Sequence, residues 1–161
     1  MASLSHLLNC GHLKILDMCL EFVEPSPEFC NALRSSRLHE LRISYAGQAV
    51  FDSRGPIIDA LTGHSLLKRL ELPHIGMHNR INEATLLEVG SALGRLVGAE
   101  SALTTLDISD CKLGDAGLSP LVDALLGNTR LRRLVCGDND ATLALEARLA
   151  SIRASTSLRI E

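Results

Sequence analysis

The most reactive side chains in this 161-residue chain are five cysteines and six histidines. Thiolates and imidazoles can act as nucleophiles, general bases or zinc ligands. Two groupings are close enough in sequence to suggest such chemistry: His6 with Cys10 and His12, and His74 with His78. The first lacks a fourth ligand at a recognisable zinc spacing, and in the second Pro73 and Gly76 argue against a helix that would align the pair. We therefore predict no metal site and no cofactor.

Motifs of the common enzyme classes are also missing from the sequence. It contains no phosphate-binding glycine loop, no G-x-S-x-G nucleophile motif and no H-E-x-x-H zinc motif. Cys111 and Cys136 fall at positions expected to face a core, where thiols behave as small apolar groups. The sequence thus predicts no catalytic residue and a protein that is not an enzyme.

A six-residue pattern, L-x-x-L-x-L, recurs along the chain. Its copies begin at Leu13, Leu38, Leu67, Leu103 and Leu131, and a partial sixth copy opens at Leu158. One copy alone is common in leucine-rich helices, but five at intervals of 25 to 36 residues indicate a repeat architecture. Strand side chains alternate between faces, so the fourth and sixth residues of each copy are predicted to point into one core.

Predicted helices follow the predicted strands and span residues 28–35, 56–61, 82–97, 115–126 and 142–152. Pro25 and Pro27 precede the first and Pro56 opens the second, and helical spacing of apolar residues indicates the other three. Apolar positions recur along one helical face: Leu86, Leu87, Leu93 and Leu96 in the third, and Leu118, Leu121, Val122 and Leu125 in the fourth. A strand–turn–helix unit of this length buries too little alone, so we predict a single domain, 1–161, of about five to six stacked repeats.

Residues 103–131, LTTLDISDCKLGDAGLSPLVDALLGNTRL, resemble a leucine-rich repeat of the ribonuclease-inhibitor type. Cys111 stands where such repeats carry Asn or Cys, and Asn139 stands there in the next copy. The resemblance implies an α/β leucine-rich repeat solenoid, a horseshoe arc with a concave parallel sheet and convex helices. The equivalent positions of the first three copies hold Glu21, Ala46 and Ile75. Asn or Cys normally satisfies backbone groups of the turn, so the resemblance leaves the loop geometry of the N-terminal half undetermined.

The third and fifth residues of the predicted strands should form two columns across the concave face. The charged and polar members are Glu40, Arg69, Thr105 and Arg133 in the third-residue column, and Asp17, Arg42, Glu71 and Asp107 in the fifth. Asp17, Arg42 and Glu71 alternate in sign, which predicts exposed ion pairs worth at most a few tenths of a kcal/mol each. These eight residues are either an ordinary charged surface or a charge-patterned groove for a partner protein.

Loops that leave the second and third strands form a further candidate binding site. The second-repeat loop is expected over residues 45–55. Candidate residues in the two loops are Tyr45, Phe51, Arg54, Met77, His78 and Arg80. Tyr and Arg dominate interface hot spots, and neighbouring repeats bring such loops together on one rim. Alternatively, Phe51 packs beneath its own loop.

Composition narrows the class of partner. The formal net charge of −3 opposes general electrostatic binding to nucleic acid. No apolar run reaches the length of a transmembrane helix, so no membrane span is expected. Five cysteines without paired spacing favour a reducing, intracellular setting, and we expect the cytoplasm.

These observations predict a non-enzymatic scaffold that binds a partner protein through its concave face and strand-exit loops, as part of a larger protein or assembly. The segment around Cys111 is also similar to repeats that follow F-boxes, which suggests substrate recognition in an F-box-type ubiquitin ligase adaptor. A third hypothesis, regulation of a small GTPase as its activator, comes from fold analogy alone. Because unpaired terminal strands promote association, self-association through uncapped ends is a further expectation.

Overall fold

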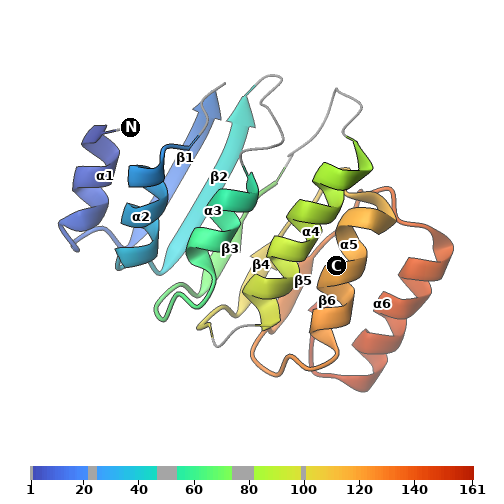
Figure 1. Ribbon diagram of the computed structural model, residues 1–161. Coiled ribbons are helices and arrows are strands. Elements are labelled where there is room, and N and C mark those ends of the chain that lie inside the picture. The colour runs from blue at the N-terminus through green and yellow to red at the C-terminus, as the bar shows by residue number, and fades with distance from the viewer. Residues whose placement is uncertain (1, 22–24, 47–53, 74–81, 99–100) are drawn as a thin grey trace.

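Helices and strands alternate along the chain and build two layers (Figure 1). The computed structural model describes residues 2–21, 25–46, 54–73, 82–98 and 101–161. Its helices are α1 (Ala2–Asn9), α2 (Pro27–Ser35), α3 (Arg54–Leu61), α4 (Glu83–Gly98), α5 (Gly114–Leu125) and α6 (Leu143–Ser155). Its strands are β1 (Ile15–Glu21), β2 (Glu40–Ala46), β3 (Arg69–Glu71), β4 (Thr105–Asp107), β5 (Arg133–Val135) and β6 (Arg159–Ile160). The strands form one parallel sheet in sequence order, and the helices cover one of its faces.

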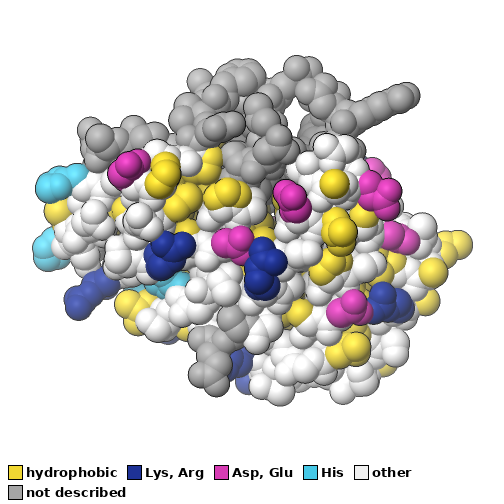
Figure 2. All heavy atoms as spheres, viewed as in Figure 1, with side chains coloured by type: hydrophobic (Ala, Val, Ile, Leu, Met, Phe, Trp, Pro, Cys, Tyr) yellow, Lys and Arg dark blue, Asp and Glu magenta, His cyan; other side chains and the backbone are white. Residues whose placement is uncertain are grey.

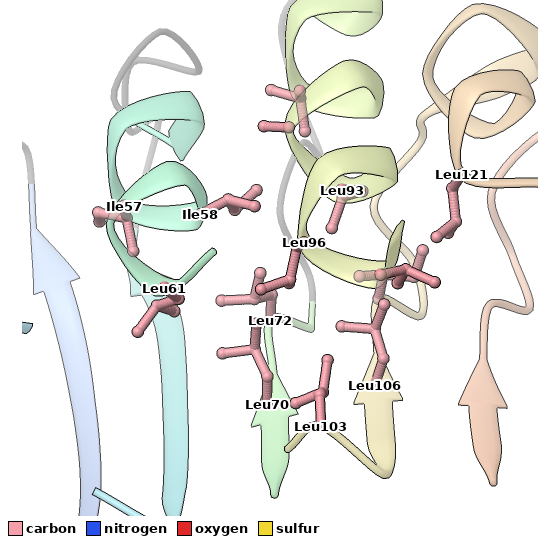
Figure 3. Packing of buried hydrophobic residues seen from close by; sticks show 14 of the residues in the cluster. Ile57, Ile58, Leu61, Leu70, Leu72, Leu93, Leu96, Leu103, Leu106 and Leu121 are labelled. Atoms are coloured by element: carbon pink, nitrogen blue, oxygen red, sulfur yellow. The ribbon is translucent and has the colours of Figure 1, made fainter. Parts of the chain in front are cut away.

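The fourth residue of each repeat forms one row across this sheet. In register, the row is Leu16, Leu41, Leu70, Leu106, Leu134 and Ile160. Its four central leucines are at most 1% exposed. They pack against helix side chains such as Leu93 and Leu96 of α4 (Figure 3). This alignment confirms the predicted α/β repeat solenoid.

The five predicted helices occur as α2 to α6, with ends displaced by at most three residues. Local signals explain α2, since the Ser26 hydroxyl accepts a hydrogen bond from the Phe29 N–H and Pro27 occupies the first turn. In α5, the four predicted apolar positions are buried. In α4 the prediction was wrong for Leu87, which is 50% exposed. Successive helix residues lie about 100° apart, so Leu86 and Leu87 do not share the buried face.

Strand length differs between the two halves of the solenoid. Strands β1 and β2 are seven residues long and pair through Glu21 and Ala46, so the loop predicted from residue 45 begins later. In contrast, β4 and β5 have three residues each. Turns follow them, with Asp110, Lys112, Asp138 and Asp140 at positive φ.

Asn139 and Cys111 stabilise these turns. The buried Asn139 amide donates to the carbonyls of Ile108 and Cys136 at 2.8 and 2.9 Å, and its oxygen accepts from the Leu113 N–H. The Cys111 thiol donates to the Leu72 carbonyl at 3.0 Å. After β4 and β5, where the pairing of the strands stops, side chains therefore satisfy the backbone groups of the turns. At the equivalent positions Glu21 and Ala46, β1 and β2 are still paired. The loops that follow Glu21 and Ala46, and Ile75 itself, lie outside the described residues.

Glycines allow α4 and α5 to pack closely. A Cβ atom on Gly90 would lie 2.1 Å from the Gly117 carbonyl oxygen, and one on Gly94 would lie 2.8 Å from the Pro120 carbonyl oxygen. Such distances are too short for any side chain, so the two helix backbones meet directly.

Candidate protein-binding face

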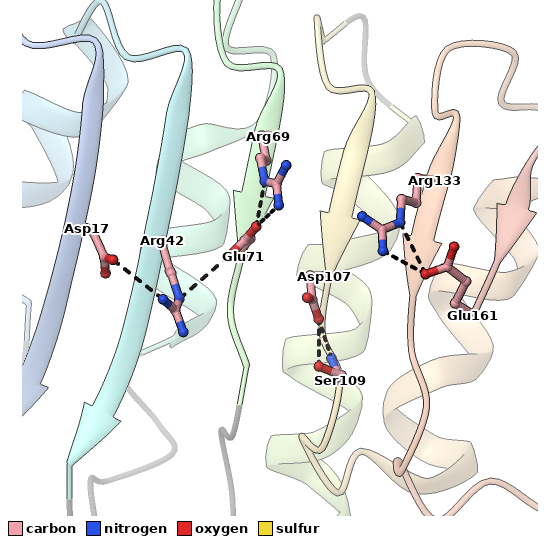
Figure 4. Close-up of polar contacts among 8 residues, drawn as sticks. All are labelled: Asp17, Arg42, Arg69, Glu71, Asp107, Ser109, Arg133 and Glu161. Atoms are coloured by element: carbon pink, nitrogen blue, oxygen red, sulfur yellow. Dashed lines mark hydrogen bonds and ion pairs between the residues drawn. The ribbon is translucent and has the colours of Figure 1, made fainter.

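The sheet face opposite the helices carries the two predicted charge columns (Figure 4). Because the strand leucines point toward the helices, the third and fifth residues project from the other face. The register aligns Glu40, Arg69, Thr105 and Arg133 in one column, and Asp17, Arg42, Glu71 and Asp107 in the other. The structure therefore brings all eight predicted concave residues onto one surface.

Ion pairs link the first three strands. Arg42 Nη1 lies 3.5 Å from Asp17 Oδ2, and Arg42 Nε lies 3.6 Å from Glu71 Oε2. Arg69 also contacts Glu71 from the same strand. The predicted alternating ladder is thus present. Arg42 and Asp17 keep half or more of their side-chain surface exposed, so their pair contributes little to stability.

A second ion-pair group occupies the last two strands. Arg133 donates to Glu161 Oε2 from Nη2 at 2.7 Å and from Nε at 3.2 Å. Arg159 contacts the other oxygen of the same carboxylate. The hydrogen bond from Arg133 lowers the pKa of Glu161, and the same bond raises the pKa of Arg133. Both groups are therefore ionised at neutral pH.

Asp107 differs from the other acids of its column. Its Oδ1 accepts from the Ser109 N–H at 3.0 Å and from the Ser109 hydroxyl at 2.7 Å. The side chain is partly buried and stabilises the turn after β4. Asp107 therefore has a local structural role that the sequence did not indicate.

Arg159 and Glu161 extend the two columns and were missed at the sequence level. Arg159 pairs in register with Arg133, and Ile160 with Leu134. Leu158 is buried, like Leu38, Leu67, Leu103 and Leu131, which open four of the other copies. However, only one residue separates Leu158 from Ile160, whereas two residues separate the first and fourth positions in the other copies. The L-x-x-L pattern therefore does not reveal that Ile160 aligns with the fourth-position leucines. From β3 to β6, the third-residue column contains only basic and neutral residues, and the fifth only acidic and neutral ones.

The rim-loop site falls largely outside the part of the chain that the structure describes. Phe51, Met77, His78 and Arg80 lie outside the described residues, as do the side chains of Tyr45 and Arg54. Tyr45 belongs by its backbone to β2, opposite Leu20 of β1, and Arg54 begins α3. The structure thus places the ends of the second-repeat loop and leaves the rim site a prediction.

The thiols of the C-terminal repeats are poorly suited to nucleophilic chemistry. Cys111 and Cys136 are both buried, and burial raises the pKa of Cys136 to about 11. Little thiolate forms at neutral pH under these conditions. Within the described ranges, no three His, Cys, Asp or Glu side chains are grouped to hold a metal ion. No helix in those ranges is both long and apolar enough to cross a membrane.

Comparison with known families identifies one repeat directly. Residues 101–122 match the family model described as Leucine Rich repeat. The matched segment contains β4, the turn with Cys111 and the first part of α5. A search of curated proteins found no match. The strand–turn–helix geometry of the matched repeat continues into the next repeat through β5 and α6.

Proposed function

Because the chain folds as a leucine-rich repeat solenoid, we propose that it is a non-enzymatic scaffold that binds a partner protein through its concave face. The observation that carries this proposal is the register of charged side chains on the face that the helices leave uncovered. Parallel strands hold those charges at spacings of about 4.8 Å. A rigid charge pattern can select a complementary protein surface.

Apart from Asp107, which stabilises the turn after β4, the concave charges make little contribution to folding. Exposed ion pairs contribute about 0–1 kcal/mol, and the core leucines lie on the opposite face of each strand. The pattern of Arg42, Glu71 and Arg133 is therefore available for recognition. We include the strand-exit loops with Tyr45, Phe51 and Arg80 in the proposed binding surface, on the general ground that such loops carry function.

The subfamily and the cellular compartment belong to the same proposal. Asn139 and Cys111 support the ribonuclease-inhibitor-like subfamily through their turn-stabilising hydrogen bonds. Buried free thiols at Cys30, Cys111 and Cys136 suit a reducing, cytoplasmic compartment. Substrate recognition for a ubiquitin ligase and activation of a small GTPase rest on resemblance, and no described residue favours either of them.

Capture of partners from cells tests the proposed face. The full chain would be compared with R42Q/E71Q, which removes an ion pair from the concave face. The matched control is D59N/R95Q, which removes an ion pair between α3 and α4 on the convex side. We expect the concave variant to lose specific partners that wild type and control retain, with thermal unfolding showing that all three are folded. Equal loss in both variants, or loss in neither, would reject the concave face as the binding surface.

A further inference from the structure

The residue after the first leucine of each repeat belongs to a separate row at the edge where the strands begin. The row consists of Lys14, His39, Lys68, Thr104 and Arg132. Backbone hydrogen bonds join its members, because each carbonyl accepts from the N–H of the next member at 2.7–2.9 Å. The backbone hydrogen bonds of the sheet thus continue one residue before the start of the strands and hold this row in the same register as the sheet.

Basic side chains are concentrated along this edge. We use the term basic edge for Lys14, Arg37, Lys68, Arg69, Arg130, Arg132, Arg133 and Arg159, which are half of the chain's 16 Lys and Arg. Acidic residues outnumber basic ones in the whole chain, 19 to 16. Even so, Glu40 is the only acid in segments 12–15, 37–40, 66–69, 102–105, 130–133 and 157–159. On the helical face, by contrast, acidic and basic side chains are mixed (Figure 2), and Arg95 and Arg148 form ion pairs with Asp59 and Asp123.

Several charges of the basic edge have no compensating carboxylate among the residues that the structure describes. Lys14, Arg37, Lys68 and Arg132 are exposed. Within the described part of the chain, none of these four forms an ion pair with a carboxylate. Arg132 Nη1 donates to the neutral Ser157 hydroxyl at 3.2 Å. A positive potential therefore persists along this edge of a protein whose net charge is −3.

We propose that the basic edge binds an extended acidic polypeptide segment of the partner protein. This inference rests on the proposed scaffold function and specifies the chemistry of the partner. From Lys14 to Arg132 the row crosses five repeats, a span of about 19 Å, which about six residues of extended chain would cover. Guanidinium groups bind carboxylates through paired hydrogen bonds, and the edge supplies both Arg and Lys.

The neighbouring acidic column favours a peptide over a nucleic acid. Glu71, Asp107 and Glu161 lie two strand positions from the third-residue column, about 7 Å between Cα atoms, and Glu71 and Glu161 contact Arg69 and Arg133 directly. These carboxylates would repel a broad phosphate backbone, whereas a single extended chain can follow the row from Lys14 to Arg132. The composition also supplies few aromatic side chains for base stacking, at 2% of residues. The basic edge and the acidic column also imply how the partner is oriented. Acidic residues of the partner would contact the starts of the strands, and basic residues of the partner would lie toward the strand ends.

A labelled peptide of about twelve glutamates, roughly twice the row length, tests the proposal by fluorescence anisotropy with the full chain. The edge variant is K68Q/R132Q, and the control R95Q/R148Q removes the same charge from the convex helices. We expect the edge variant to bind about tenfold more weakly and the control to stay within about twofold of wild type. Added salt should weaken binding by screening.

Competing ligands separate this inference from the scaffold function. Absent binding of the glutamate peptide, equal loss in both variants, or tighter binding of polyuridylate RNA or phosphatidylserine vesicles would overturn the acidic-segment proposal. If any of these results occurs while R42Q/E71Q still loses cellular partners, the scaffold function stands and only the partner chemistry is wrong. If the peptide binds as expected but R42Q/E71Q retains every partner, the concave-face proposal fails instead.

Discussion

At the residue scale, two different side chains perform the same task before a strand. Asn128 and His64 each lie three residues before the first leucine of a repeat. Asn128 Oδ1 accepts from the N–H groups of Arg130 and Leu131 at 2.9 and 2.7 Å. In the repeat that begins at Leu67, His64 Nδ1 accepts from the equivalent N–H groups. These are the N–H groups of Leu66 and Leu67, at 3.3 and 3.0 Å. The turn into β3 therefore depends on an unprotonated Nδ1.

His64 makes the stability of this turn dependent on pH. The side chain is buried, and burial lowers its pKa below the ordinary value of about 6.5. The unfolded chain then binds more protons than the folded chain near that pH. The stabilisation is fully present above about pH 6.5 and is lost as the pH falls toward the folded-state pKa. We expect the free energy of unfolding from urea titrations to decrease over that window.

The variant His64→Asn supplies the control, because it places the acceptor of Asn128 at the equivalent position. It should retain most of the stability at neutral pH and lose the part of the pH dependence due to His64. An unchanged slope in the variant would assign the pH dependence to other groups.

At the element scale, the contact between α4 and α5 depends on glycine. Gly90→Ala would place a methyl group against the Gly117 carbonyl, so the helices must separate. We expect a loss of about 1–3 kcal/mol from overpacking, despite the better helix propensity of Ala. Urea unfolding monitored by circular dichroism measures the change.

Gly98→Ala is the matched substitution in the same helix. Among the described residues, no heavy atom beyond its own helix backbone and chain neighbours lies within 4 Å of the added Cβ, so this variant should be neutral or slightly stabilised. Equal effects of the two substitutions would mean that α4 and α5 are farther apart than the structure places them.

At the scale of the whole molecule, each repeat is stabilised by its neighbours. Leu106 lies in the middle of the leucine row and is fully buried, whereas Ile160 lies in β6 at the edge and is partly buried. We expect Leu106→Ala to cost about 2–5 kcal/mol through the cavity left between sheet and helices.

Ile160→Ala should cost less, because β6 is paired in the sheet on one side only. The same denaturant titration compares both variants. A larger effect at Ile160 than at Leu106 would contradict the stacking order of the repeats.

Much of the architecture could be predicted from local pattern. The recurrence of L-x-x-L-x-L predicted the aligned row of Leu41, Leu70, Leu106 and Leu134, because strand alternation is encoded in adjacent residues. Apolar spacing likewise predicted α5 to within a residue at either end. The concave candidates followed from the same alternation, so their common surface was predictable, whereas their binding role stays a proposal.

Apart from the predicted ladder of Asp17, Arg42 and Glu71, the contacts between repeats were decided only in the tertiary structure. The Leu158–Ile160 spacing hides the register of β6, and the direct meeting of Gly90 with Gly117 has no local signal. Glu161 becomes part of a charge column only when β6 pairs with β5. The spacing of apolar residues therefore determined which residues face the core, because this spacing is a property of residues that are neighbours in the sequence. Three-dimensional packing decided that Glu161 meets Arg133 and that Gly90 meets Gly117, because these partners lie 28 and 27 residues apart in the chain and no local pattern links them.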